Sequence, residues 1–145
     1  MQLDIITPDR KLLSVNAQSV SLPGIDGDME VFDSHAPVLT LLKTGVLEFK
    51  RPSEAVPPEG KEGTWSGDGS SLRIMVSGGF AEVDNQHVTV LTEHAALPEE
   101  VDAPELRKIL ADLEQQQRES STNAHNYNMI SAEIERVTTK IDIVS

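Results

Sequence analysis

The sequence predicts a mainly β protein that carries a helical appendage. In the first two thirds of the 145 residues, short stretches rich in Val, Ile, Leu and Thr recur between Gly, Pro, Asn and Asp. This pattern is typical of short strands joined by turns. After Leu97-Pro98 the apolar residues recur at intervals of three and four, as in amphipathic helices. Only 3% of the residues are aromatic, so we expect Val, Leu and Ile to supply most of the buried area.

Six stretches are predicted strands: residues 2–7, 15–22, 38–42, 46–50, 72–76 and 87–92. In residues 72–76 the apolar side chains alternate, so we expect one face of that strand to be buried. Turn-forming residues between Val83 and Val88 predict a hairpin. Several short strands at this spacing indicate a sandwich or a barrel.

Residues 51–71 are predicted to form a long hairpin loop, because Pro and Gly punctuate them and no regular apolar period is present. The single tryptophan, Trp65, lies in this segment. Its ring either folds back onto the sheet or contacts a partner.

A helical hairpin is predicted after residue 97. Asp102 or Ala103 would cap the first helix with Pro104 at its first position, and the helix would end in or near residues 115–123. Its apolar stripe consists of Leu106, Ile109, Leu110 and Leu113. The second helix carries a narrow apolar seam formed by Tyr127, Ile130, Ile134, Val137, Ile141 and Val144. The seam either packs on the first helix and the sheets or detaches to bind another groove.

Composition and charge exclude several functions. The 24 acidic residues outnumber 12 basic ones, which disfavours nucleic-acid binding. The absence of cysteine excludes disulfides, a thiol nucleophile and a thiolate zinc site, and fits a reducing compartment. The sequence shows no signal-peptide pattern and no apolar run long enough for a membrane span, so we expect no direct membrane insertion.

No catalytic constellation is found. The chain lacks a P-loop and a nucleophile elbow. The four histidines, at positions 35, 87, 94 and 125, lack the spacing of a metal site. We therefore expect no catalytic residue, no metal and no cofactor.

Two separated motifs resemble a known family. Residues 22–27 read Leu-Pro-Gly-Ile-Asp-Gly, and residues 35–47 read His-Ala-Pro-Val-Leu-Thr-Leu-Leu-Lys-Thr-Gly-Val-Leu. Together they resemble the signature of the epsilon subunit of F-type ATP synthases. Residues 77–83, Ser-Gly-Gly-Phe-Ala-Glu-Val, are similar to the second signature of that family. With the helical tail, the resemblance spans nearly the whole chain.

The resemblance implies a flattened, ten-stranded β-sandwich over residues 1–97 and a regulatory two-helix hairpin over residues 98–145. It implies a noncatalytic rotor subunit of the central stalk that binds the gamma subunit and the c-ring and couples proton flow to ATP synthesis. The hairpin would contact the catalytic beta subunit transiently. The expected location is peripheral, on the cytoplasmic face of a bacterial inner membrane, although a processed organellar chain would look the same.

The resemblance also implies a turn that faces the c-ring. The positions are Asp28, Met29, Glu30 and His35. Asp28 and His35 match the family pattern, whereas Glu30 and Asp33 stand where Gly and Pro are usual, so we expect a more acidic and more salt-sensitive contact. The alternative for Asp28 is simple solvation of a turn.

Some bacterial members of the family bind ATP through an Ile/Leu-Asp-x-x-Arg-Ala motif and a preceding glutamate. Here Asp102 matches, but Glu105 occupies the arginine position and Ala96 the glutamate position. Because Glu105 would repel phosphate, we expect little or no ATP binding. Residues 98–145 also carry ten acidic and five basic side chains, so any inhibition by the hairpin should depend on the apolar seam.

Two other classes of function stay open at this point. The chain could be a free-standing, metal-dependent sandwich enzyme that uses His35, Glu82 or another histidine, or a generic adaptor module. The enzyme would contain stoichiometric metal and be active alone, whereas the adaptor would have partners outside the synthase.

Overall fold

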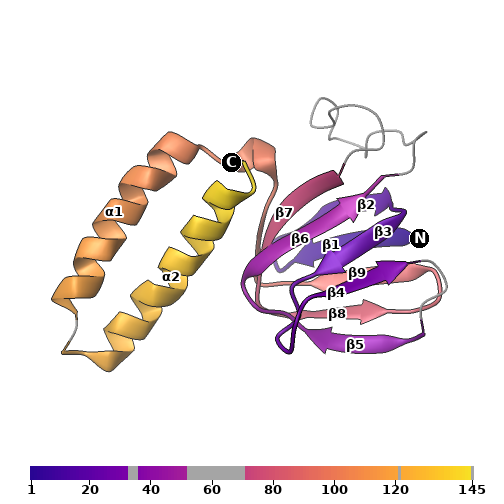
Figure 1. Cartoon of the computed structure of the whole chain (residues 1–145), viewed down its shortest axis with the longest axis horizontal. Coiled ribbons are helices and arrows are strands. Elements are labelled where there is room, and N and C mark those ends of the chain that lie inside the picture. The colour runs from indigo at the N-terminus through magenta and orange to yellow at the C-terminus, as the bar shows by residue number, and fades with distance from the viewer. Residues whose placement is uncertain (33–35, 52–70, 121, 145) are drawn as a thin grey trace.

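The computed structural model describes residues 1–32, 36–51, 71–120 and 122–144. A sandwich of two sheets lies beside a hairpin of two long helices (Figure 1). This architecture confirms the predicted mainly β fold with a helical appendage. The strands are β1 (Gln2–Thr7), β2 (Arg10–Asn16), β3 (Ser19–Leu22), β4 (Met29–Phe32), β5 (Val38–Leu41), β6 (Gly45–Lys50), β7 (Ser71–Ser77), β8 (Phe80–Val83), β9 (His87–Leu91) and β10 (His94–Ala96).

Each sheet contains five strands. The first sheet has the order β2-β1-β9-β8-β5, and the second has the order β10-β7-β6-β3-β4. The β1–β9 pair is parallel and the other pairs are antiparallel. The core between the sheets is aliphatic, as the composition predicts, and its fully buried members include Leu3, Ile5, Val20, Leu47 and Ile74. Because side chains from both inner faces interdigitate, the sandwich forms a stiff body.

The prediction of one strand over residues 15–22 is wrong. Strand β2 ends at Asn16 in the first sheet, and β3 begins at Ser19 in the second. At the crossing, the Ala17 amide donates to the Met1 carbonyl (2.8 Å) and the Gln18 amide donates to the Lys50 carbonyl (2.7 Å). The residues on both sides favour extended backbone, so the change of sheet leaves no break in the apolar pattern. Strands β4, β8 and β10 are also absent from the six predicted stretches.

The segment predicted as a long loop connects two neighbouring strands. Strands β6 and β7 pair antiparallel, with Lys50 opposite Ser71. Residues 52–70, including Trp65, lie outside the described residues.

The two helices begin at capping residues. A short 3-10 helix, η1 (Pro98–Glu100), leads into α1 (Ala103–Glu119), and α2 spans Ala124–Asp142. The Asp102 carboxylate accepts a hydrogen bond from the Glu105 amide (3.3 Å), which confirms Asp102 as the N-cap. Pro104 occupies the second helical position and not the predicted first, because the helix begins at Ala103. The α1 helix also ends within residues 115–123, as expected.

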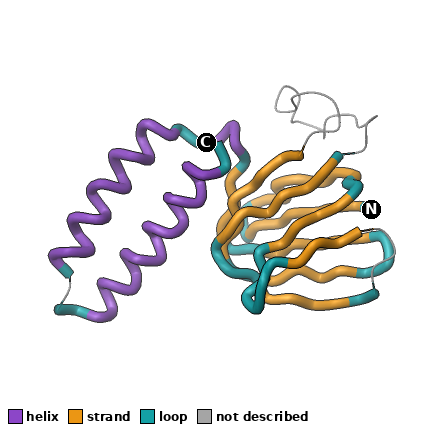
Figure 2. The backbone as a smooth tube through the Cα atoms, in the orientation of Figure 1, coloured by secondary structure: helices purple, strands orange, loops and turns teal. Residues whose placement is uncertain are grey.

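The hairpin contacts the sandwich through one end only (Figure 2). Ile143, just beyond α2, packs with Met75 and Ala96. The Arg73 guanidinium donates to the Asp142 carbonyl (3.2 Å) and lies 3.8 Å from its carboxylate. Along the helices themselves, α1 contains no buried side chain and α2 contains only one, Val137. The hairpin is therefore anchored at the C-terminal end of α2.

None of the described helices has the length and apolar character needed to cross a membrane.

Candidate interaction surfaces

The solvent face of the first sheet carries a row of apolar side chains. Cross-strand register places Ile6 beside Leu91, Leu91 beside Phe80, and Phe80 beside Leu41. Leu41 is 59% exposed, and Leu39, two residues earlier on β5, is 65% exposed. A contiguous apolar row on a sheet face that no described element covers is typical of a protein–protein contact.

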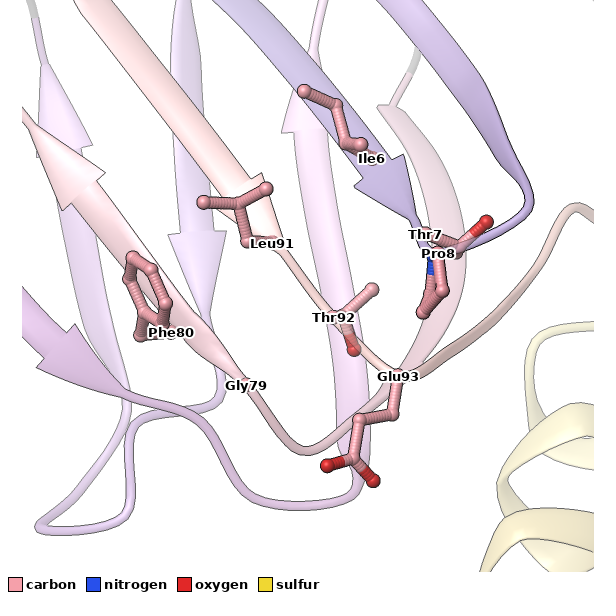
Figure 3. Close-up of a pocket in the computed structure, with 8 residues that line it drawn as sticks. All are labelled: Ile6, Thr7, Pro8, Gly79, Phe80, Leu91, Thr92 and Glu93. Atoms are coloured by element: carbon pink, nitrogen blue, oxygen red, sulfur yellow. The ribbon is translucent and has the colours of Figure 1, made fainter.

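Phe80 separates two open hollows on this face. The first, of about 480 Å³, is shown in Figure 3 and is lined by Ile6, Thr7, Pro8, Gly79, Phe80, Leu91, Thr92 and Glu93. The second, of about 500 Å³, is lined by Pro37, Val38, Leu39, Phe80, Glu82, Val83 and Asp84. Both hollows are mainly apolar, so they suit side chains of a partner better than a polar small molecule.

A glycine turn positions Phe80. Gly78 and Gly79 adopt φ angles of 74° and 86° between β7 and β8. A Cβ atom on Gly79 would lie only 1.9 Å from the Leu91 carbonyl oxygen, so only glycine allows this close approach. The turn therefore presents Phe80 at the point where β8 and β9 come together.

The hydroxyl of Thr92 stabilises the same glycine turn. It accepts from the Ser77 amide (3.2 Å) and lies within donating distance of the Ser77, Gly78 and His94 carbonyls, at 3.0, 2.8 and 3.2 Å. Thr92 is only 4% exposed. A buried hydroxyl with several partners holds its surroundings rigid, which fixes the floor of the first hollow.

Sequence reasoning did not assign this face a role. A usable signal was present, because Val38-Leu39-Thr40-Leu41 carries large apolar residues at positions facing both sides of the sheet. A strand of that kind is expected to be covered on both faces.

The acidic turn before β4 forms a second surface. Asp28 has 73% of its side chain exposed and lies 3.8 Å from the Lys43 ammonium. Glu30 is also exposed, whereas Met29 is half-buried against the core. The structure thus brings two carboxylates to solvent here, while His35 and Asp33 lie outside the described residues.

Two glycines shape this turn. The Gly27 amide donates to the Gly24 carbonyl (3.1 Å), and Gly27 has a φ angle of 134°. A Cβ atom on Gly24 would approach the Gly27 carbonyl oxygen to 2.6 Å. Ile25, between them, is 57% exposed although its amide is tied to the Leu41 carbonyl (2.8 Å). The turn is therefore defined by its backbone while its side chains stay accessible.

The predicted seam lies along α2, which packs against α1. Val137 is 2% exposed, and Ile130, Ile134 and Ile141 are half-buried. The two ends of the seam are more open: Tyr127 is 41% exposed, and Val144, which lies beyond the helix, is 39% exposed. In the first helix, Ile109 is 39% exposed, so the α1 stripe is only partly covered.

The three nucleotide-motif positions meet at the base of the hairpin. Ala96, Asp102 and Glu105 help to line a hollow of about 310 Å³, together with Ala95, Glu100, Leu106 and Lys140. Three of these side chains are carboxylates and one is basic. The Asp102 carboxylate already caps α1.

A polar cluster surrounds Asp4 at the other end of the first sheet. The Asp4 carboxylate lies 2.6 Å from the His87 imidazole and 3.6 Å from the Lys11 ammonium. Burial acts to raise the pKa of Asp4, but hydrogen bonds with Ser14, His87 and Gln2 outweigh it and hold the pKa below the ordinary 3.8. This cluster fastens β1 to its neighbours β2 and β9.

Within the described part of the chain, no group of three His, Asp or Glu side chains has an arrangement that could hold a metal ion.

Comparisons with solved structures recover the same fold. The chain superposes on a chain of the Euglena gracilis mitochondrial ATP synthase, in a structure of OSCP, F1 and the c-ring, with a TM-score of 0.70 and 23% identity, covering 94% of this chain and 76% of that one. It also superposes on a chain of the Tetrahymena thermophila mitochondrial ATP synthase central stalk and c-ring, with a TM-score of 0.58 and 12% identity, covering 100% and 96% of the two chains.

Sequence comparisons identify the family. Residues 1–57 match the family described as "ATP synthase, Delta/Epsilon chain, beta-sandwich domain". The ATP synthase epsilon chain of Fuscovulum blasticum is 37% identical over 112 residues, which cover 77% of this chain and 74% of the relative. That of Jannaschia sp. is 32% identical over 124 residues, which cover 86% and 82%. The chain therefore belongs to the family of ATP synthase epsilon chains, which are central-stalk subunits of the F-type ATP synthase.

Proposed function

We propose that this chain is a noncatalytic rotor subunit that joins the gamma subunit to the c-ring and couples proton flow to ATP synthesis. The observation that carries this proposal is a stiff sandwich with two separate accessible surfaces, the apolar face of the first sheet and the acidic turn before β4. A part that transmits torque between two bodies needs a rigid core and two distinct contacts. The membership of the epsilon family supports the same role.

The gamma subunit binds the apolar face of the first sheet. Leu39 and Leu41 are mostly exposed in the isolated chain. Burying a leucine side chain completely contributes about 1.5–3 kcal/mol, so the row that contains Leu41, Phe80 and Leu91 can supply much of the affinity for a large partner.

The c-ring binds the acidic turn. Asp28 and Glu30 offer carboxylates to basic and amide groups of the ring loops. The resemblance assigns Met29 and His35 to the same contact, and His35 lies outside the described residues. The weak pair with Lys43, at 3.8 Å, leaves the Asp28 carboxylate available for a partner. Because both carboxylates are exposed, this contact should weaken as salt increases.

Residues 98–145 form a separable regulatory domain. The domain attaches to the sandwich through Ile143, the Arg73–Asp142 pair and the ion pair between Arg10 of β2 and Glu100 of η1. Residues 1–97 form the body that binds gamma and the ring. When released, the hairpin would expose the seam from Tyr127 to Val144 and contact the catalytic beta subunit transiently.

Restraint of ATP hydrolysis by this domain should depend on the apolar seam rather than on charge, because acidic side chains outnumber basic ones in residues 98–145. Deleting residues 98–145 should raise the ATPase activity of the assembled enzyme. Unchanged ATPase activity after the deletion would remove the regulatory proposal and leave the coupling role intact.

The hollow at the base of the hairpin does not suit ATP. Glu100, Asp102 and Glu105 would repel the phosphates, and Lys140 is the one basic side chain among the residues that line it. Isothermal titration should detect no micromolar binding of ATP to the intact chain. A micromolar dissociation constant would contradict this expectation.

The site of action is the cytoplasmic face of a bacterial inner membrane, where the chain is held peripherally by the other subunits. An affinity-tagged chain, expressed in its host, tests the role as a whole. Mass spectrometry of the captured material should identify the gamma subunit and the ring. Capture of proteins unrelated to the synthase alone would favour an adaptor, and stoichiometric metal with activity in the isolated chain would favour an enzyme.

A further inference from the structure

Carboxylates surround the two hollows on the outer face of the first sheet. Glu93 lines the first hollow (Figure 3), and Glu82 and Asp84 line the second. All three are exposed, and no lysine or arginine lines either hollow among the described residues. Glu82 and Glu93 form no ion pair with another described residue. The face therefore combines an apolar centre with an uncompensated acidic rim.

We propose that these hollows are two sockets that receive apolar side chains of the gamma subunit on either side of Phe80, while lysine or arginine side chains of gamma meet Glu93 on one side and Glu82 and Asp84 on the other. This inference rests on the proposed function and specifies the chemistry of its gamma contact. The partner segment is thus both apolar and basic.

The negative charge of the rim favours the gamma subunit over a second copy of this chain or an anionic lipid surface. A second copy of this chain would bring its own acidic rim against the first, and like charges across an interface oppose association. An anionic lipid surface would be repelled for the same reason, and the chain as a whole carries a formal charge of −12. A basic protein surface faces neither penalty.

The two components should affect binding differently. Filling the sockets removes apolar area from water and slows dissociation. Exposed carboxylates at a rim act mainly on the association rate, through a long-range attraction that salt screens. Phe80 and the rim carboxylates can therefore be tested separately.

The first test measures the affinity and rates of the full chain for the recombinant gamma subunit of the same synthase. Phe80→Ala should weaken binding by about tenfold or more, mostly through faster dissociation, because Phe80 walls both sockets. The matched control is Phe32→Ala, which removes an aromatic side chain that is 57% exposed on the second sheet. Its affinity for gamma should stay at the wild-type value.

A second arm tests the rim. The double variant Glu82→Gln, Glu93→Gln should associate more slowly with gamma at low salt, and its association rate should lose most of its salt dependence. The control is Glu48→Gln, which removes an exposed charge from β6 in the other sheet. Faster or unchanged association of the double variant would overturn the assignment of a basic partner segment.

Leu39→Ser guards against a folding artefact, because Leu39 lines the second hollow, is 65% exposed and contributes little to the core. Circular dichroism and thermal unfolding establish that each variant is folded. If wild type itself fails to bind gamma, the proposed function falls. If wild type binds gamma while folded Phe80→Ala and Leu39→Ser bind gamma as tightly as wild type, the function stands and the two-socket inference falls.

Discussion

The sandwich and the helical hairpin differ sharply in how they are stabilised. Among its described residues, the sandwich buries a continuous core in which twelve large side chains are less than 2% exposed, Leu3, Ile5 and Ile74 among them. Within the described residues, the two helices bury only Val137, and Ile143 follows just after them. The same chain thus combines a body that unfolds as a whole with an arm that depends on a small anchor.

The difference matches the two tasks of the proposed function. A body that carries torque must resist deformation, which dense packing provides. An arm that regulates must leave its resting place at a small cost in free energy, and few contacts hold the hairpin in place. Changes in the two regions should therefore have different consequences.

The largest effect is expected in the sandwich core. Ile74→Ala removes a fully buried side chain between the sheets, and such truncations destabilise proteins by about 2–5 kcal/mol. Chemical denaturation should show a lower free energy of unfolding for the whole sandwich. A loss below about 1 kcal/mol would mean that the core is less tightly packed than the structure indicates.

The next effect concerns the anchor. Ile143→Ala should release the C-terminal end of α2 from Met75 and Ala96, at a local cost of about 2 kcal/mol. Hydrogen exchange should accelerate in α1 and α2 while the amides of the sandwich core keep their protection. Val144→Ala, at a position that is 39% exposed, is the matched control and should leave both regions unchanged. Equal acceleration in the sandwich would show that the two regions unfold together.

The third effect is on the pH dependence of the stability of the sandwich. The pKa of Asp4 is lowered on folding, so its contribution to stability is present above the ordinary value of 3.8 and is lost as pH falls through the folded pKa. Asp4→Asn should cost about 1–2 kcal/mol at neutral pH and flatten the decline of sandwich stability in acid. The exposed Asp26→Asn is the control. An unchanged pH profile for Asp4→Asn would contradict the assignment.

The smallest effect is expected at the helix caps. Asp102→Ala removes the acceptor for the Glu105 amide and should cost about 1 kcal/mol, confined to the hairpin. Hydrogen exchange in the first turn of α1 measures it. Asn123→Ala, which removes the equivalent cap from the Asn126 amide, should act on α2 by a similar amount. A loss of protection in β7 after either change would show tighter coupling between the regions than we expect.

Local patterns predict the elements better than their arrangement. Alternation and turn residues anticipate β1, β6, β7 and β9, and the cap at Asp102 was recognisable because its neighbour Pro104 suits only the first turn of a helix. The crossing from one sheet to the other at Ala17 and Gln18 cannot be predicted from the sequence, because it depends on hydrogen bonds to Met1 and Lys50 that no local pattern encodes.

The candidate surfaces show the same division. The family resemblance together with the glycines before it places Asp28 in an exposed turn, whereas Glu30, assigned to the same turn, lies on β4. The apolar row required tertiary pairing, because Ile6, Phe80 and Leu91 come from three strands, and β1 lies beside β9 only in the folded sheet. A surface assembled from distant strands is invisible until the sheet order is known.

Proton pumping driven by ATP hydrolysis tests the coupling role most directly. The synthase would be assembled in membrane vesicles with the wild-type chain, without it, and with Phe80→Ala. We expect the enzyme that lacks the chain to hydrolyse ATP without acidifying the vesicles, and the wild-type chain to restore pumping, with Phe80→Ala restoring it less. Full pumping in the complete absence of the chain would contradict the conclusion that this subunit couples the two halves of the machine.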